Sequence, residues 1–143
     1  SPFDDNLKVC DLTKVSLFLV NEIEGYQITG EKEPEKILAA VKEKYPSAKI
    51  VLTLGGEGSA YQDETGIYRQ GIFKVKAVDT TAAGDTFGAA LAIRLCKGSK
   101  IEDAILFAHA AAGICVSRLG AQTSIPTEEE VENFLTERIG GVL

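Results

Sequence analysis

The stretch from Lys49 to Gly58 reads KIVLTLGGEG, an apolar run that passes directly into three glycines. The run has no regular alternation of polar and apolar residues, which is typical of a parallel strand covered on both faces. The glycines after it allow the chain to turn at once. This stretch therefore predicts a buried strand over 49–54 that ends in a tight turn.

A second apolar run lies upstream, and a helical pattern separates the two runs. Val15–Val20 (VSLFLV) is rich in β-branched and aromatic residues. Apolar residues then recur at helical spacing over Pro34–Tyr45, with a proline suited to the first turn and Pro46 ending the helix. Strand, helix and strand in this order indicate a βαβ unit with parallel strands, in which ligands collect at the carboxyl ends of the strands.

Strands continue into the middle of the chain. Ser59–Gln62 and Gly66–Gln70 flank a polar turn and indicate a hairpin. Phe73–Val78 (FKVKAV) alternates like an edge strand. The fold class that these patterns predict is α/β.

Three helical patterns follow Asp79. The first has an apolar face and ends before Gly98. The second and third open with the spacing of a capping box, at Ser99–Glu102 and Thr127–Glu130. The last residues, Gly140–Leu143, are expected to fray. We see no repeat or interdomain linker, so one domain is expected.

Composition excludes several classes of protein. Hydrophobic residues make up 45% of the 143, enough for a substantial core, but no apolar stretch reaches the roughly 20 residues that span a bilayer. The net charge of −6 argues against broad binding to nucleic-acid phosphates. Cys10, Cys96 and Cys115 lie far apart in apolar stretches, which predicts buried thiols in a reducing cytoplasm, and the start of the chain shows no signal-peptide pattern.

The residues Val78–Phe87 (VDTTAAGDTF) carry most of the candidate chemistry. A strand is expected to end here and a helix to begin, and small residues between them would let an anion approach the unpaired N–H groups of the helix N-terminus. Asp85 at the edge of such a site would repel a phosphate, unless it accepts the proton of an incoming hydroxyl. Alternatively, Asp79 and Asp85 only cap a helix, and the small residues form a tight turn.

The run from Asp79 to Phe87 resembles the anion-hole signature of the PfkB carbohydrate kinase family, and its ribokinase branch most closely. The resemblance extends over essentially the whole chain. It implies a three-layer, ribokinase-like (Rossmann-like) α/β fold, of which residues 1–143 would be the C-terminal, nucleotide-binding and catalytic part. The family's substrate-binding residues and small β lid belong to its N-terminal half, so these residues alone are expected to lack sugar kinase activity.

Three further segments are similar to family motifs in the same order. Asn21–Glu24 is similar to the Asn-x-x-Glu motif that helps to place Mg²⁺, often through water, and the nucleotide phosphates. Thr53–Gly58 resembles the Gly-x-x-Gly segment beside the nucleotide, and the alanine-rich helix near His109 resembles the adenine site. Without the family, these would be a polar pair in a loop, a strand-to-hairpin turn and a core histidine. The nucleotide-binding residues that the resemblance implies are Asn21, Glu24, Thr53, Gly55, Gly56, Gly58 and His109.

Ribokinase-like proteins also hold a monovalent cation beside the anion hole. The resemblance implies K⁺, bound mostly by main-chain oxygens that order the loop without touching substrate. The side chain of Cys115 would play no part. The implied ligands are the Asp79 carboxylate, the Ser124 hydroxyl and the carbonyls of Thr81, Cys115, Arg118 and Gly120.

The activity implied is ATP-dependent phosphoryl transfer to a sugar hydroxyl. Asp85 would be the base, in a turn with Ala82, Ala83 and Gly84, and the N–H groups of residues 83–85 would stabilise the transferred charge. Two alternatives stay open: a kinase of a nucleoside or other small alcohol, and a non-catalytic nucleotide-binding module. The resemblance also implies a homodimer of the full-length protein, and neither nucleic acid nor membrane is expected as a partner.

Overall fold

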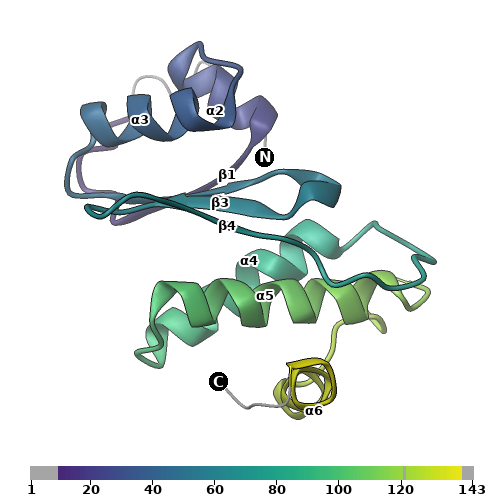
Figure 1. Cartoon of the computed structure of the whole chain (residues 1–143). Helices are drawn as coiled ribbons and strands as arrows, with labels where there is room; N and C mark the ends of the chain where they lie inside the picture. Colours follow the sequence, from purple (N-terminus) through teal and green to yellow (C-terminus); the bar gives the residue numbers. More distant parts are fainter. Residues whose placement is uncertain (1–9, 121, 140–143) are drawn as a thin grey trace. The chain divides into compact units, whose positions relative to one another are not determined.

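The computed structural model describes residues 10–120 and 122–139 (Figure 1). The segment Gly140–Leu143, which we expected to fray, lies outside the described residues. The chain divides into two compact units, of which the first ends at Gly71 and the second begins at Ile72. Strands belong to the first unit and the three longest helices to the second.

The first unit contains a mixed four-stranded sheet in the order β1-β2-β3-β4. The first two strands are parallel and the others antiparallel. This confirms the βαβ unit and the hairpin, although β1 begins two residues later than the predicted Val15. The strands are β1 (Leu17–Asn21), β2 (Lys49–Thr53), β3 (Ser59–Gln62) and β4 (Ile67–Gln70).

Two helices connect β1 to β2, where the sequence predicted one. The predicted helix is α3 (Pro34–Lys44), and α2 (Glu22–Thr29) precedes it directly after β1. The sequence analysis missed α2 because Gly25 is its only buried residue, so no apolar periodicity marks it. A Cβ at Gly25 would lie 2.8 Å from Cγ2 of Ile37, so the lack of a side chain lets α2 approach α3 closely.

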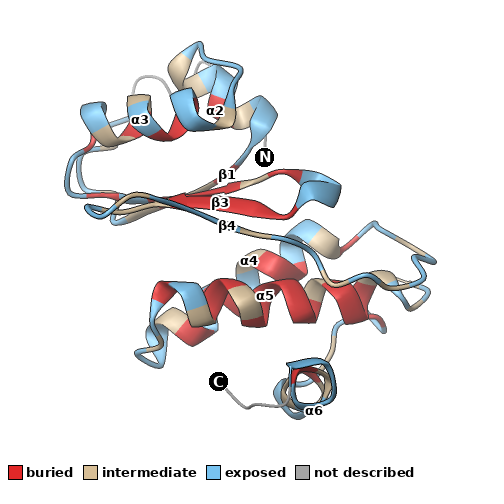
Figure 2. Ribbon diagram, in the orientation of Figure 1, coloured by how far each residue is buried: buried red, intermediate tan, exposed pale blue. Residues whose placement is uncertain are grey.

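The core of the first unit lies between the sheet and α3 (Figure 2). Ile37, Leu38 and Val41 of α3 belong to one buried cluster with Ile50 and Leu52 of β2. Burial of each such side chain contributes roughly 1.5–3 kcal/mol. The cluster therefore fixes the helix against the strands whose carboxyl ends carry the candidate residues.

The second unit contains three helices, of which α4 and α5 pack against each other. Residues along most of α5 are buried (Figure 2). Gly98, with φ 85°, follows the last turn of α4 and ends that helix as predicted. The helices are α4 (Ala83–Cys96), α5 (Ile101–Val116) and α6 (Glu128–Ile139).

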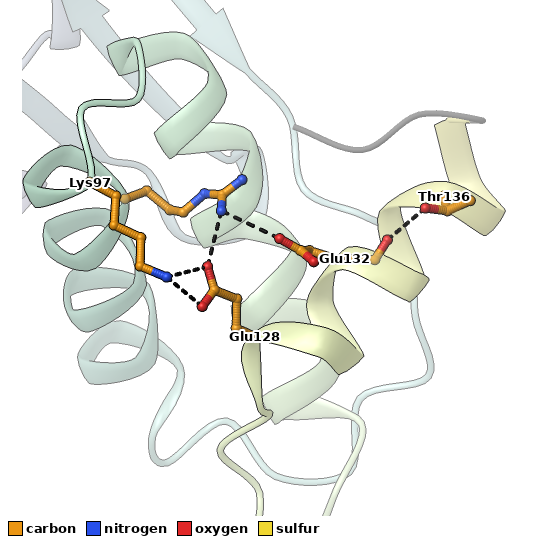
Figure 3. A network of polar contacts seen from close by, with 5 residues as sticks. Lys97, Glu128, Glu132 and Thr136 are labelled. Atoms are coloured by element: carbon orange, nitrogen blue, oxygen red, sulfur yellow. Dashed lines mark hydrogen bonds and ion pairs between the residues drawn. The ribbon is translucent and has the colours of Figure 1, made fainter.

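A buried arginine joins α4 to α6. Nη1 of Arg94, a residue only 6% exposed, lies 3.1 Å from Glu128 Oε1 and 3.5 Å from Glu132 Oε1, and Lys97 Nζ binds Glu128 Oε2 at 2.6 Å (Figure 3). The guanidinium also lies over the ring of Phe107, 4.4 Å from its centroid. Because a buried charge is costly unless paired, these contacts fix α6 at one place on α4.

Two local predictions for the second unit are wrong. Phe73–Val78 forms no strand: Phe73 and Val75 are half-buried near Gly113 of α5, but no strand pairs with this segment in the described part of the chain. The alternation of apolar residues in this segment thus reflects packing against a helix and not strand pairing. The N-cap residue of α5 is Lys100 and not Ser99, and no side chain caps this helix, so Ser99–Glu102 is no capping box.

The prediction of three buried thiols is wrong for two of them. Cys115 is buried, whereas Cys10 and Cys96 are exposed; none of the three forms a disulfide. Cys96 is the last residue of α4 and lies on the opposite side of that helix from the buried Phe87. No described helix has the length and apolar character needed to cross a membrane.

Candidate functional site

The predicted anion-binding turn is the N-terminus of α4. Ala82 occupies the N-cap position and offers no side-chain hydrogen bond. The N–H of Ala83 donates to the Thr80 carbonyl at 3.2 Å, whereas those of Gly84 and Asp85 have no acceptor among the residues that the structure describes. Two of the three expected donors are therefore available at the positive end of a 14-residue helix.

The space over this turn is open. A Cβ at Gly84 would meet no atom within 4 Å, and the residue does not have a positive φ, so neither packing nor backbone conformation requires glycine here. Asp85 is exposed, and its carboxylate makes no hydrogen bond or ion pair with any described residue. The arrangement offers two N–H donors and a free carboxylate to a ligand.

Asp79 ties the start of this turn to the loop after α5. Its Oδ1 accepts from the Thr81 hydroxyl at 2.5 Å and the Thr81 N–H at 2.9 Å, and its Oδ2 accepts from the Gly120 N–H at 3.3 Å. These hydrogen bonds, with that of the Thr81 hydroxyl first, lower the pKa of Asp79. Thr81 and Gly120, whose carbonyls are implied cation ligands, thus lie beside the Asp79 carboxylate and contact it through N–H and hydroxyl groups.

The end of α5 holds the same turn from the other side. The Val116 carbonyl accepts from the N–H groups of Val78 at 2.7 Å and Asp79 at 3.1 Å. The Cys115 carbonyl accepts from the Arg118 N–H at 3.2 Å, and Arg118 Nη2 lies 2.7 Å from Oε1 of Glu130. Carbonyls that a helix C-terminus leaves unpaired are therefore used to attach the candidate turn and loop.

A buried polar contact links α4, α5 and the loop. The Thr86 hydroxyl donates to Cys115 Sγ at 3.4 Å, and this sulfur lies 3.2 Å from Ser124 Oγ. Ser124 was an implied cation ligand, but Thr86 was not among the predicted residues. The sequence signal that could have identified Thr86 is its position directly after Asp85.

The ligand set that the resemblance implies is of the kind that an alkali cation takes. The described residues contain no group of three or more His, Cys, Asp or Glu side chains that could hold a metal ion. The implied ligands are instead carbonyl oxygens with one carboxylate and one hydroxyl, and carbonyl oxygens are ligands that K⁺ takes. The residues present therefore fit K⁺ better than a transition metal.

His109 is buried in the second unit. It is 5% exposed, and its ring lies 4.7 Å from that of Phe87 in an edge-on arrangement. Burial lowers the pKa of His109 to about 4, so the imidazole is neutral at neutral pH. These surroundings match the alternative of a core histidine, and a role beside adenine stays a prediction.

In the first unit, the other candidate residues gather at the carboxyl ends of β1 and β2. Asn21 and Thr53 are partners in the parallel register, and the Thr53 hydroxyl donates to the Val20 carbonyl at 3.4 Å. A 3₁₀ turn, Gly55–Glu57, follows β2 almost at once. This is the edge at which ligands of parallel sheets collect.

Asn21 and Glu24 form a capping box at the start of α2. Asn21 Oδ1 accepts from the Glu24 N–H at 2.9 Å, and Glu24 Oε2 accepts from the Asn21 N–H at 3.0 Å. The pair is therefore not a pair of loop side chains, as one alternative had it. Glu24 Oε1 makes no hydrogen bond within the described residues, so one carboxylate oxygen fits a water or a hard cation such as Mg²⁺.

The fold requires only some of the glycines after β2. Gly58 has φ 99°, and a Cβ there would lie 1.9 Å from the Gln70 carbonyl oxygen, so the hairpin requires glycine. Gly55 has φ 54° but open space around it, and Gly56 has neither a positive φ nor a neighbour within 4 Å. The fold thus explains Gly58 fully and leaves Gly56 free to face a ligand.

Comparison with curated protein sequences identifies a family and its members. The profile of the family described as pfkB family carbohydrate kinase matches residues 2–128, a range that includes every candidate residue above. Ribokinase of Bacillus subtilis is 42% identical over 103 residues, which cover 72% of this chain and 35% of that protein. Ribokinase of Arabidopsis thaliana is 36% identical over 130 residues, which cover 87% of this chain and 34% of that protein.

Solved structures agree. The ribokinase of Arabidopsis thaliana complexed with ribose and ATP superposes with a TM-score of 0.79 and 33% identity over 94% of this chain and 44% of its own. The ribokinase of Thermotoga maritima superposes with a TM-score of 0.74 and 40% identity over 85% of this chain and 42% of its own. The chain thus spans about two-fifths of the length of these relatives. With its fold of the ribokinase-like α/β class, the chain belongs to the PfkB family of carbohydrate kinases.

Proposed function

We propose that these residues form the nucleotide-binding and catalytic part of a kinase that transfers the γ-phosphoryl group of ATP to a sugar hydroxyl. The observation that carries this proposal is the open N-terminus of α4, where the N–H groups of Gly84 and Asp85 and the Asp85 carboxylate are all unengaged by described residues. The relatives named ribokinase, one of them solved with ribose and ATP, support a sugar as acceptor.

Asp85 is the proposed base. Its carboxylate takes the proton of the acceptor hydroxyl while that oxygen bonds to the γ-phosphorus and the bond to the ADP oxygen breaks. The N–H groups of Gly84 and Asp85, with the dipole of α4, stabilise the charge on the transferred group. Ala82 and Ala83 present no side chain large enough to cover the turn.

Two cations fit the residues present. When bound, Mg²⁺ neutralises charge on the nucleotide phosphates, and Glu24 would hold it, directly or through water, by its open oxygen. We propose that Asn21, Thr53, Gly55, Gly56 and Gly58 lie beside the nucleotide. For K⁺, the proposed ligands are those around Asp79, where the cation would order the turn that begins with Thr81.

The acceptor pocket is proposed to lie outside the 143 residues, because the chain spans about two-fifths of its relatives. The residues here would then not phosphorylate sugar alone. A nucleoside or another small alcohol is the alternative acceptor. We propose that the whole kinase is a cytoplasmic homodimer, and three cysteines without disulfides support a reducing compartment.

The test is ADP release by the intact protein with a panel of sugars and nucleosides, with and without K⁺. Asp85→Asn is expected to lower turnover by about 10²–10⁴-fold, because the base is lost, without unfolding the protein. The matched control is Asp103→Asn: Asp103 is also the third residue of a helix, α5, so the same charge is removed from the same position.

Two results would contradict the proposal. Near-normal turnover by Asp85→Asn would exclude this residue as the base. Sugar-dependent ADP release by residues 1–143 alone would show that the acceptor pocket lies within them.

A further inference from the structure

Three buried side chains form a continuous polar chain in the second unit. Thr86 is 4% exposed, and Cys115 and Ser124 are each 1% exposed. The Thr86 hydroxyl donates to Cys115 Sγ at 3.4 Å, and Sγ lies 3.2 Å from Ser124 Oγ, where either atom can donate. The sulfur is therefore the middle member, in contact with both hydroxyls.

The geometry is consistent with the chemistry of a thiol. A thiol carries one S–H donor, and its sulfur can also accept. It can therefore accept a hydrogen bond from the Thr86 hydroxyl and donate one to Ser124 Oγ. Buried polar groups are costly when unpaired, so each member keeps the next in place. An apolar side chain at position 115 would fill space without this directional constraint.

The three residues stand at functionally distinct places. Thr86 follows Asp85 in the first turn of α4, and Ser124 lies beyond Gly120 in the segment after α5. Cys115 is the penultimate residue of α5, next to Val116, whose carbonyl holds the segment that leads into the turn. The thiol thus bridges the helix start that carries the candidate base and the loop that carries candidate cation ligands.

We infer that Cys115 is a positioning residue, whose thiol couples the start of α4 to the loop after α5. The catalytic consequence rests on the proposed function of Asp85, whereas the coupling itself does not. The Cys115 side chain, which was expected to play no part in cation binding, is then the link between the two parts of the site.

Hydrogen–deuterium exchange of the intact protein tests the coupling without any assay of activity. In Cys115→Ala, the hydrogen-bonded amides of Thr86 and of Ile125, next to Ser124, are expected to exchange about tenfold faster, because each segment loses its side-chain hydrogen bond to the sulfur. Cys115→Ser keeps a donor and acceptor and is expected to restore most of the protection. Cys96→Ala, at an exposed free thiol of α4, is the matched control and should change neither segment.

Thr86→Val provides a second route if Cys115→Ala fails to fold. It removes one hydroxyl at nearly constant volume and is expected to speed exchange of the Ile125 amide, next to Ser124 on the far side of the sulfur. Wild-type exchange there, or a change confined to α5 in Cys115→Ala, would overturn the coupling.

Kinetics then separate this inference from the proposed function. Cys115→Ala should lower kcat several-fold with little change in KM for the sugar, and Cys115→Ser should recover it. Faster exchange with an unchanged kcat would support the coupling but overturn its catalytic consequence.

Discussion

Helices α2 and α4 both begin in a segment that resembles a family motif, but their N-termini are built in opposite ways. At α2, Asn21 and Glu24 cap each other's N–H groups through a reciprocal pair of hydrogen bonds. At α4, Ala82 provides no cap, and the N–H groups of Gly84 and Asp85 have no acceptor among the described residues. One helix start is closed by its own side chains, and the other is left open.

Capping and anion binding at a helix N-terminus exclude each other, so the two helix starts serve different purposes. A cap uses the same N–H groups that a bound phosphate would use, so a capped start gains stability and gives up anion binding. The open start of α4 is suited to bind charge, whereas the closed start of α2 holds the Glu24 carboxylate at the end of β1. Stability withheld at a functional site is a common cost of activity.

Apart from loss of the Asp85 carboxylate, covering the open start of α4 should produce the largest effect. In Gly84→Ala, a methyl group would enter the open space beside one of the two proposed N–H donors, so kcat/KM for ATP-dependent turnover is expected to fall about 10²-fold. Stability should be unchanged or higher by up to about 1 kcal/mol, because alanine favours the helix. The expected result, measured on one preparation, is therefore a fall in activity without a fall in thermal stability.

Gly58→Ala is the matched control for that substitution. Its positive φ and the Gln70 carbonyl oxygen 1.9 Å from the new Cβ predict destabilisation by at least about 2 kcal/mol. A comparable loss of stability in Gly84→Ala would show that glycine 84 is structural and would remove the contrast between the two helix starts.

Opening the closed start should have a smaller effect. Asn21→Ala removes the N-cap of α2 and is expected to lower the free energy of unfolding by about 1 kcal/mol in urea titrations. Asn21→Ser retains an acceptor for the Glu24 N–H, so it should lower the free energy of unfolding by only about a few tenths of a kcal/mol. Equal losses in the two variants would mean that the cap is not what Asn21 contributes.

Regular burial made much of the fold predictable. The strands of the βαβ unit, the hairpin and the last three helices could be predicted because apolar spacing records which side is buried. Helix α2 could not, because its contact with α3 depends on the absence of a side chain at Gly25. Phe73–Val78 shows the converse, since its alternation reflects contact with a helix and not strand pairing.

The site was predictable only in part, because residue spacing does not reveal hydrogen-bond partners. Asn21–Glu24 and Ser99–Glu102 both allow a capping box, but only the first forms one, and it had been interpreted as a ligand pair. The contact of Cys115 with Thr86 spans 29 positions and depends on how α4 packs on α5. No local pattern carries such information.

A third helix start, that of α6, gives the smallest expected effect. Thr127 and Glu130 cap each other, and the predicted capping box is thereby confirmed. The Arg118 guanidinium, followed by the Thr127 N–H, lowers the pKa of Glu130 from 4.5 to about 2. Because the folded pKa is the lower one, the stabilisation is complete above pH 4.5 and is lost as the pH falls toward 2.

Thermal unfolding followed from pH 6 to 2 measures this contribution. Glu130→Gln should flatten part of the fall in Tm between pH 4.5 and 2, while Glu129→Gln, at an exposed neighbour without a cap, should leave it unchanged. The effect is small because the Arg118–Glu130 pair is partly exposed and screened by solvent. An acid slope that survives in Glu130→Gln would mean that the reciprocal cap, closed in α6 as in α2, contributes no measurable stability through its charge.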